Sequence, residues 1–262
     1  MMNESLKIFL DKKAHQYERP DFIADDPISV PHRFVLKQDI EIAGFFAAVL
    51  AWGNRKSIIN SCNRLLSWMQ GAPHDFIMHF EEKDLQPFLT FKHRTFNATD
   101  LFHFFDFLKF HYKTNKQPSL ETAFSNHLQP ADPTIENALT GFYNAFFDEQ
   151  IFEDFPKRTR KHIATPFKKS ACKRLNMFLR WMVRSSVKGV DFGLWKQIKP
   201  SQLVCPLDLH VARVAKHFGL LQRPNNDWIA AVELTNHLKE LDANDPVKYD
   251  FALFGLGVVE KF

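Results

Sequence analysis

The sequence predicts an all-α protein. Glycine is scarce, at 9 of 262 residues, and few runs alternate apolar with polar residues, so the turn and strand signals of a β protein are weak. Apolar residues instead recur at the three- and four-residue spacing of helices. With 45% apolar and 24% charged residues, the composition is that of a globular protein with a substantial core. We expect one helical unit over residues 1–262, with two lobes inside it: a scaffold over 38–150, and a basic lobe formed by 151–262 with the N-terminal helix.

The chain opens with helical segments separated by a loop. Residues 4–17 have helical apolar spacing, and a stretch rich in Asp and Pro follows over 19–32. Residues 38–51 form a strongly apolar helix that ends at Trp52-Gly53-Asn54, where Gly53 suits a left-handed stop, and a further helix covers 55–69. The corner at Trp52 is either a packed helical hairpin or the wall of a pocket, and the pattern favours the hairpin.

The pattern stays helical over residues 72–150, which we interpret as scaffold. Its expected helices start at polar caps or at a proline in the first helical position. They cover 101–111 after Thr99 and Asp100, 120–128 after Ser119, and 134–147 after Asp132-Pro133.

The second half of the chain begins with a linker over 151–169. Ser170 is the expected cap of a helix over 171–184, whose apolar residues face inward and leave its cations exposed, namely Lys173, Arg174, Arg180 and Arg184. After a loop over 185–200, Asp208 begins a helix that Gly219 ends. Two last helices begin at Asp227 and at Asp245-Pro246.

Positive charge is concentrated in one block. The formal net charge is +4, but between Lys157 and Lys188 there are 11 Lys or Arg and no Asp or Glu, so the rest of the chain carries +4 − 11 = −7. Such a block favours polyanions through electrostatic attraction and counterion release. The alternative is a solvated basic face.

Other signals exclude several classes of protein. The three cysteines, Cys62, Cys172 and Cys205, form no C-x-x-C pair or His/Cys cluster, so we expect no metal, iron–sulfur cluster or other cofactor. No apolar run is long enough to span a membrane, and the N-terminus lacks the features of a signal peptide. We expect a cytoplasmic monomer, associated with the nucleoid when it binds DNA.

One motif of the sequence is Pro206-Leu207-Asp208-Leu209-His210-Val211-Ala212-Arg213-Val214-Ala215, followed by Gly219-Leu220. This motif resembles the signature around the catalytic aspartate of helix-hairpin-helix DNA glycosylases. Asp208, His210, Arg213, Val214 and Gly219 match that signature. A weaker resemblance covers residues 45–54, which are similar to the early buried helix that ends beside the base pocket in this superfamily. Over nearly its full length the chain also resembles a family of uncharacterised bacterial proteins, through strings such as Ser-Ala-Cys-Lys-Arg-Leu-Asn.

The chain departs from the superfamily at the hairpin whose backbone amides grip a phosphate. The hairpin is replaced in this chain by Thr165-Pro166-Phe167-Lys168-Lys169-Ser170. Bifunctional members carry a lysine just after the hairpin, with Asn three positions further on, which matches Lys173 and Asn176. Lys169 is the competing choice, because it fits the archaeal 8-oxoguanine glycosylases, whose hairpin is also atypical. The four-cysteine cluster of endonuclease III is missing, as it is from 8-oxoguanine glycosylases.

The resemblance implies an enzyme that excises an oxidised purine such as 8-oxoguanine from double-stranded DNA, with possible AP-lyase activity. Lys173 or Lys169 would attack the sugar, and Asp208 would stabilise the cationic sugar and relay protons. The implied DNA-binding residues are Lys168, Ser170, Arg174, Arg180, Arg184, His210 and Arg213, and the implied base pocket is Trp52, Gly53, Asn54 and Trp181.

Plainer interpretations of these residues stay open. Asp208 can be a simple helix cap worth about 1 kcal/mol, and Lys173 a phosphate contact or a surface charge. The tryptophans can be core residues. At the level of the whole protein, the alternatives are a non-catalytic nucleic-acid-binding protein derived from the glycosylase fold and a helical interaction module with a basic face.

Overall fold

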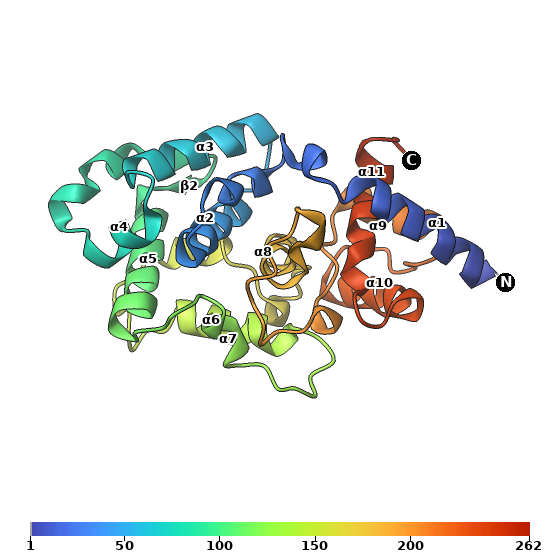
Figure 1. Cartoon of the computed structure of the whole chain (residues 1–262). Helices are drawn as coiled ribbons and strands as arrows, with labels where there is room; N and C mark the ends of the chain where they lie inside the picture. Colours follow the sequence, from blue (N-terminus) through green and yellow to red (C-terminus); the bar gives the residue numbers. More distant parts are fainter. Residues whose placement is uncertain (1) are drawn as a thin grey trace. The chain divides into compact units, whose positions relative to one another are not determined.

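The computed structural model describes residues 2–262 and is built almost wholly of helices, so the all-α prediction is confirmed (Figure 1). A two-stranded antiparallel hairpin pairs β1 (Lys92–His93) with β2 (Phe96–Asn97). The helices are α1 (Met2–Tyr17), α2 (Lys37–Val49), α3 (Arg55–Trp68), α4 (Pro73–His79), α5 (Ala98–Lys109), α6 (Thr122–Ser125), α7 (Glu136–Phe146), α8 (Lys173–Val183), α9 (Leu209–His217), α10 (Trp228–Leu241) and α11 (Tyr249–Val258). Within residues 2–262, no helix combines the length and apolar character needed to cross a membrane.

The chain divides into two compact units, each assembled from separate stretches of sequence. Unit 1 consists of residues 1–24, 128–140 and 164–262, and unit 2 consists of 25–127 and 141–163. Helix α7 begins in unit 1 and ends in unit 2. These bounds differ from those of the expected lobes, because residues 128–140 fold with the C-terminal part of the chain; the functional division into a scaffold lobe and a catalytic lobe stays a prediction.

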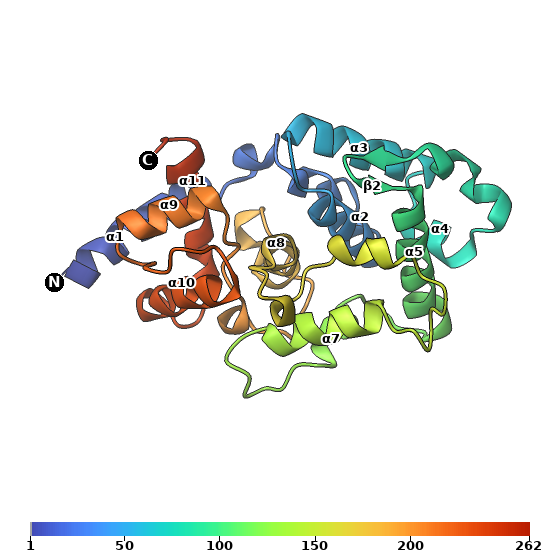
Figure 2. The same cartoon turned by 180° about the vertical axis from the view of Figure 1, so that it is seen from behind.

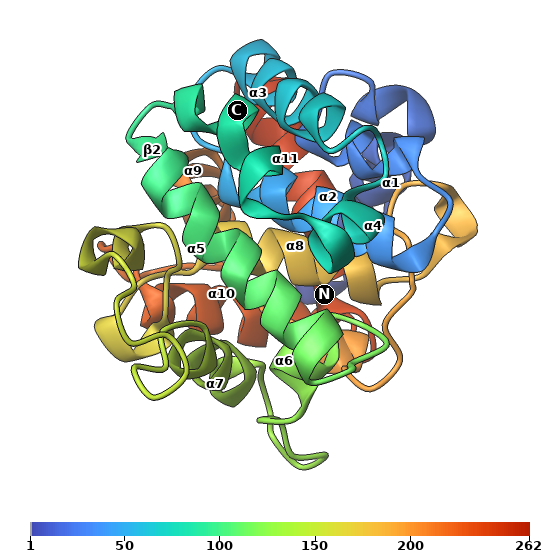
Figure 3. The same cartoon turned by 90° about the vertical axis from the view of Figure 1, so that its left-hand side faces the viewer.

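In unit 2 the apolar helix α2 lies beside α3 and α4 (Figure 3). The core around α2 consists largely of aromatic rings. The ring of Phe45 on α2 stacks on Phe104 of α5, with their centroids 5.5 Å apart. Phe104 in turn meets Phe146 of α7 edge-on at 4.8 Å. Ring contacts of this kind add to the gain from burying large apolar surfaces. The aromatic stripes expected to form a scaffold therefore lie in a packed core.

Unit 1 is centred on the C-terminal helix α11, which contacts α1 on one side and α9 on another (Figures 1 and 2). Two glycines permit this packing. A Cβ atom on Gly255 would lie 2.2 Å from the ring of Tyr17 on α1. A Cβ on Gly257 would lie 3.1 Å from both Cβ and the backbone oxygen of His210 in the first turn of α9. The pair Gly255 and Gly257 thus lets α11 approach its neighbours and sets the position of the start of α9.

Several helix starts differ from the expected ones. Asn97, rather than Thr99 or Asp100, caps α5: its side chain accepts from the Asp100 amide at 3.4 Å, and the Asp100 carboxylate accepts from the Asn97 amide at 3.0 Å. This reciprocal pair is a capping box that places the acidic partner at the third helical position. The helix expected over 120–128 is only the short α6. The Ser119 hydroxyl donates to the buried carboxylate of Glu41 and accepts from the Glu121 amide at 3.2 Å.

Helix α8 also begins later than expected. It starts at Lys173, and the preceding Cys172 is in the left-handed region with φ 50° and gives no side-chain cap. The Ser170 hydroxyl accepts from the Cys172 amide at 3.2 Å, and Ser170 forms an isolated bridge with Asp227. The expectation that Ser170 caps α8 is therefore wrong: Ser170 fixes the turn before the helix.

Candidate catalytic site

Lys173 and Asp208 lie together in unit 1. Lys173 is the first residue of α8, Asp208 immediately precedes α9, and the lysine Nζ is 3.2 Å from Asp208 Oδ2. The two side chains are 33% and 20% exposed, so the pair is partly shielded but open to solvent. Among residues 2–262, Lys173 is the lysine within ion-pair distance of Asp208, whereas Lys169 is not. Lys173 is thus the nearer of the two candidate lysines to Asp208, and the choice of nucleophile stays a prediction.

The two carboxylate oxygens of Asp208 make different contacts. Oδ1 accepts from the backbone amides of His210 and Val211, both at 2.9 Å, so Asp208 is the cap of α9, as expected. Oδ2 faces Lys173. Oδ1 is therefore occupied by backbone N–H groups at the start of the helix. The cap interpretation of Asp208 is thus correct but incomplete, because one oxygen remains for another partner.

A constrained turn precedes α8. Residues 166–168 form one 3-10 turn, and both Lys169 (φ 59°) and Cys172 (φ 50°) adopt the left-handed conformation that favours glycine. The carbonyl of Lys169 accepts from the amide of Trp228 at 3.3 Å, which fastens the turn to the start of α10. The side chains of Phe167, Lys168 and Lys169 are exposed. Non-glycine residues in strained conformations are concentrated at functional sites in proteins, which makes this turn notable beside Lys173.

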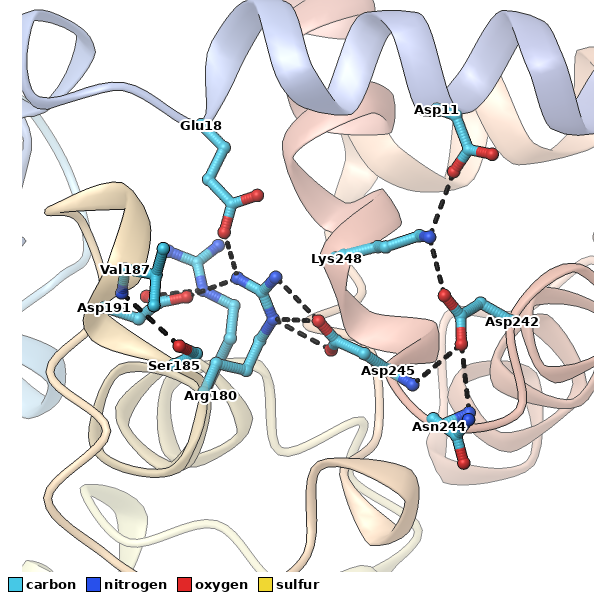
Figure 4. A network of polar contacts seen from close by, with 11 residues as sticks. Asp11, Glu18, Arg180, Ser185, Val187, Asp191, Asp242, Asn244, Asp245 and Lys248 are labelled. Atoms are coloured by element: carbon cyan, nitrogen blue, oxygen red, sulfur yellow. Dashed lines mark hydrogen bonds and ion pairs between the residues drawn. The ribbon is translucent and has the colours of Figure 1, made fainter.

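Unit 1 also contains a network of ion pairs formed by two arginines of α8 and several carboxylates (Figure 4). Arg184 is only 4% exposed and contacts three carboxylates: Glu18 at 2.8 Å, Asp191 at 2.5 Å and Asp245 at 2.8 Å. Arg180, 8% exposed, pairs with Asp250 and lies 3.4 Å from Asp191. The expectation that Arg180 and Arg184 are exposed for DNA is therefore wrong. The apolar spacing of α8 marked them as outward-facing, but carboxylates from distant parts of the chain enclose them.

Asp250 links this network to the candidate site. It is buried on α11, and its pKa is raised by burial, an effect that the Arg180 guanidinium partly offsets. The charges of Asp208 and Lys173 also act on Asp250, in opposite directions. The sulfur of Cys205 lies 4.0 Å from Asp250. Asp250 is thus a buried carboxylate that the charges of Lys173 and Asp208 influence, and sequence patterns did not single it out.

The other predicted DNA-binding residues in unit 1 differ in what they do. Burial lowers the pKa of the half-buried Arg174 to about 10. Arg213 donates to the carbonyls of Phe262 at 2.7 Å and Gly257 at 2.8 Å, so its guanidinium holds the end of α11. His210 is exposed in the first turn of α9. Of these three, His210 and Arg213 are on the surface, and Arg213 already has structural partners.

The residues predicted to form a base pocket are divided between the units. Trp52, Gly53 and Asn54 belong to unit 2, and Trp181 is fully buried in the core of unit 1 with no face open to a base. The Arg94 guanidinium lies over the Trp52 ring at 5.0 Å, and Gly53 has φ 112°. The side chain of Asn54 caps α3 by accepting from Ser57 at 3.3 Å. The Trp52 corner is thus a turn that joins α2 to α3, and its Asn54 also lines an open hollow beside α3.

The basic block is divided in the same way. Its first cations, over residues 157–161, belong to unit 2, where Arg158 pairs with Asp100 at 3.0 Å and Arg160 with Glu149 at 2.9 Å. The remaining cations belong to unit 1. No group of three or more His, Cys, Asp or Glu within residues 2–262 is arranged to hold a metal ion.

Comparison with protein families gives one match. Residues 26–259 match the model of a family described as a protein of unknown function, DUF2400. The chain belongs to this family. The resemblance to a full-length family of unknown function is therefore confirmed, while the match gives no support to the resemblance to glycosylases. No curated protein and no solved structure matches the chain.

Proposed function

We propose that this protein is a DNA glycosylase with AP-lyase activity, which removes an oxidised purine such as 8-oxoguanine from double-stranded DNA. The observation that supports the proposal most is the approach of Lys173 to Asp208, at 3.2 Å. An amine and a carboxylate at the starts of two helices were expected from separate parts of the sequence signature, 208 − 173 = 35 positions apart. The choice of lesion rests on the resemblance of the Asp208 segment to the glycosylase signature.

In the proposed reaction, Lys173 acts as the nucleophile. Its neutral amine forms a bond to the sugar carbon C1′ while the bond from C1′ to the base breaks, and the base leaves with the bonding electrons and takes up a proton. The attached nitrogen then loses one proton, and its lone pair opens the C1′–O4′ bond while O4′ takes up a proton, which gives a protonated imine. An activated lysine of this kind is an established form of covalent catalysis.

Asp208 has two roles in this scheme. It accepts the proton that Lys173 loses before it attacks, since Oδ2 already faces the amine. It then passes this proton to the leaving base, and its restored negative charge stabilises the positive charge that develops on the sugar. The two amides bound to Oδ1 hold the carboxylate in place through the reaction.

The exposed cations near the pair supply the proposed contact to DNA. Lys168 and Lys169 project from the turn before α8, with the exposed ring of Phe167 beside them. Lysines contact phosphates without reading the base sequence. Arg180 and Arg184 are not part of this surface, because carboxylates of the same unit already neutralise them.

Covalent trapping tests the proposal. Borohydride reduces an imine to a stable amine, so incubation with a duplex that contains 8-oxoguanine should yield a covalent protein–DNA complex. We expect Lys173→Gln to reduce trapping to background. Lys169→Gln is the matched control, since it removes the same charge four residues away, from a lysine that does not pair with Asp208; it should weaken binding and retain trapping.

Two other outcomes would change the proposal, one in its nucleophile and one in its class of protein. Trapping that survives Lys173→Gln and is lost with Lys169→Gln would reassign the nucleophile. If no lesion in a panel of damaged duplexes yields released base or trapped protein, while binding stays salt-sensitive, the protein is a non-catalytic nucleic-acid-binding protein.

A further inference from the structure

A second cationic feature lies on unit 2, apart from Lys173 and Asp208 in unit 1. It is an open hollow of about 580 Å³ along α3, which we call the α3 hollow. It is lined by Asn54, Lys56, Ser57, Asn60, Ser61, Arg64 and Lys92. The lining thus contains three cations, four neutral hydrogen-bonding side chains and no carboxylate.

The charge of the α3 hollow is not neutralised by the protein. Helix α3 contains no Asp or Glu. Across residues 2–262, no carboxylate lies within ion-pair distance of Lys56, Arg64 or Lys92, although many other surface cations of the chain are paired. Like charges held together in a hollow raise the local concentration of anions. The hollow therefore attracts a negatively charged ligand.

Arg64 is held in position for such a ligand. Its guanidinium lies 5.4 Å from the ring centres of both Trp68 and Phe91, and one nitrogen donates to the carbonyl of Lys92 at 3.2 Å. This contact also joins α3 to β1. A guanidinium fixed by rings and a backbone carbonyl loses little freedom when it binds a phosphate with its remaining N–H groups.

The spacing of the cations that line the hollow favours an extended polyanion over a small anion. Lys56 and Arg64 are eight positions apart on one helix, which at 1.5 Å per residue separates them by about 12 Å along the axis. Phosphates follow one another at about 3.4 Å per step along the axis of each duplex strand, so the two cations span about three to four steps. No apolar or aromatic side chain lines the hollow, so nothing in it would enclose a base.

We propose that the α3 hollow binds consecutive phosphates of a nucleic-acid backbone, without reading its sequence. The inference rests on the proposed function only in the choice of duplex DNA as the ligand. It gives unit 2 a role of its own in binding, and it places Asn54 beside the phosphates rather than in a base pocket.

The test compares two double variants with the same change of charge. Lys56→Gln/Lys92→Gln removes two cations from the hollow. Lys113→Gln/Lys116→Gln removes two exposed lysines of unit 2 that do not line it. Fluorescence anisotropy with a labelled 24-bp duplex, measured over a range of salt concentrations, gives the slope of log Kd against log salt. Each phosphate contact contributes about 0.9 to that slope, so the hollow variant should lower it by about 1.8 and the control should leave it unchanged.

Three further arms make the result decisive. Lys56→Arg/Lys92→Arg keeps the charge and should keep the wild-type slope. Inorganic phosphate at 1 mM should not displace the duplex; displacement from the wild type but not from the Gln variant would make free phosphate the ligand and overturn the proposal. Equal slopes for the hollow variant and its control would overturn it as well. Base release at saturating DNA tests the proposed function separately, because its absence from every variant leaves the comparison of slopes intact.

Discussion

Asp208 is both a structural and a chemical residue, and its two oxygens allow the roles to be separated. Oδ1 caps α9 through two backbone amides, and Oδ2 faces Lys173. Asn is as good a helix cap as Asp but carries no charge. A change at this one residue can therefore remove the proposed chemistry while the helix start is kept.

We expect Asp208→Asn to retain the fold and lose activity. Its melting temperature should stay within a few degrees of wild type, because the cap remains. Base release in single-turnover assays should fall by a factor of about 10² to 10⁴, the usual contribution of a proton-transferring group. Asp208→Ala is the comparison, since it should also lose about 1 kcal/mol of stability through the missing cap. Full excision by Asp208→Asn would leave Asp208 as a cap alone.

Single residues were predictable from sequence where the signal was local. The start of α9 at Asp208 and its end at Gly219 follow from residues within one helix, and Gly219 does take a positive φ of 70°. The burial of Arg184 was not predictable, because its partners Glu18 and Asp245 are 166 and 61 positions away in the chain. Helical periodicity records which side of a helix is apolar, and carries no information on carboxylates brought in by folding.

Among the elements, the turn before α8 depends on the start of α10. Asp227 caps α10 by accepting from Ala230 at 3.0 Å, and it forms a bridge with Ser170 in the turn. The Arg223 side chain donates to both carboxylate oxygens of Asp227, at 2.7 and 2.6 Å, and lowers the pKa of Asp227 to about 2. The bridge between Ser170 and Asp227 is a backbone contact, and it joins the start of α10 to the turn that presents Lys168 and Lys169.

This arrangement predicts a specific acid dependence. Because the pKa of Asp227 is depressed in the fold, its ionised form stabilises the protein above the ordinary value of 3.8, and that stability is lost as the pH falls towards about 2. Asp227→Asn keeps a cap but loses the ion pair. Thermal melts at pH 6, 4, 3 and 2 should therefore show a lower melting temperature for the variant at pH 6, and a difference that shrinks below pH 4. Asp25→Asn is the control, and a difference for Asp227→Asn that is constant over this range would contradict the prediction.

Elements with strong periodicity were predicted well, and short or irregular ones were not. Helices α2, α3, α9 and α10 lie within a few residues of their expected bounds. The hairpin of β1 and β2 was missed because two-residue strands show no alternation to detect. The start of α8 was misplaced because a serine before a helix usually caps it, whereas Ser170 pairs with Asp227, a residue far along the chain.

At the scale of the whole molecule, the ion-pair network is the main polar feature within unit 1. It joins the end of α1, the end of α8, the loop that follows α8, and the segment before α11, through Glu18, Arg184, Asp191 and Asp245 (Figure 4). The Arg184 and Arg180 guanidinium groups also lie over the ring of Phe251, at 5.4 and 4.3 Å from its centre. Removing one arginine would leave several buried carboxylates without their counter-charge.

We expect Arg184→Leu to destabilise the protein by about 3–5 kcal/mol, the usual cost of removing one partner from a buried ion pair. Urea denaturation followed by circular dichroism measures this change. The matched control is Lys188→Gln, an exposed cation four positions on, which should change the stability by about 0.5 kcal/mol or less. A loss below about 1 kcal/mol for Arg184→Leu would mean that water, rather than the arginine, solvates the carboxylates.

The division into units is the part of the architecture that sequence predicted least. The linker at 151–169 suggested one boundary, but the chain passes between the units at 24/25, 127/128, 140/141 and 163/164. The segment 128–140 joins unit 1 through side-chain contacts such as Gln202 Nε2 to the carbonyl of Asp132 at 3.1 Å. Such long-range pairings leave no trace in local composition.

The packing of α1 on α11 has a consequence for synthesis of the chain. Lys13 reaches Glu260 at 2.6 Å, across 247 positions of sequence. At about 5–20 residues per second on a ribosome, roughly 12–50 s separate the emergence of these two residues. During that interval α1 lacks its contacts with α11, and its apolar residues Leu10 and Ala14 are buried in the finished fold. Unit 1 therefore completes its folding last, although its first helix is made first.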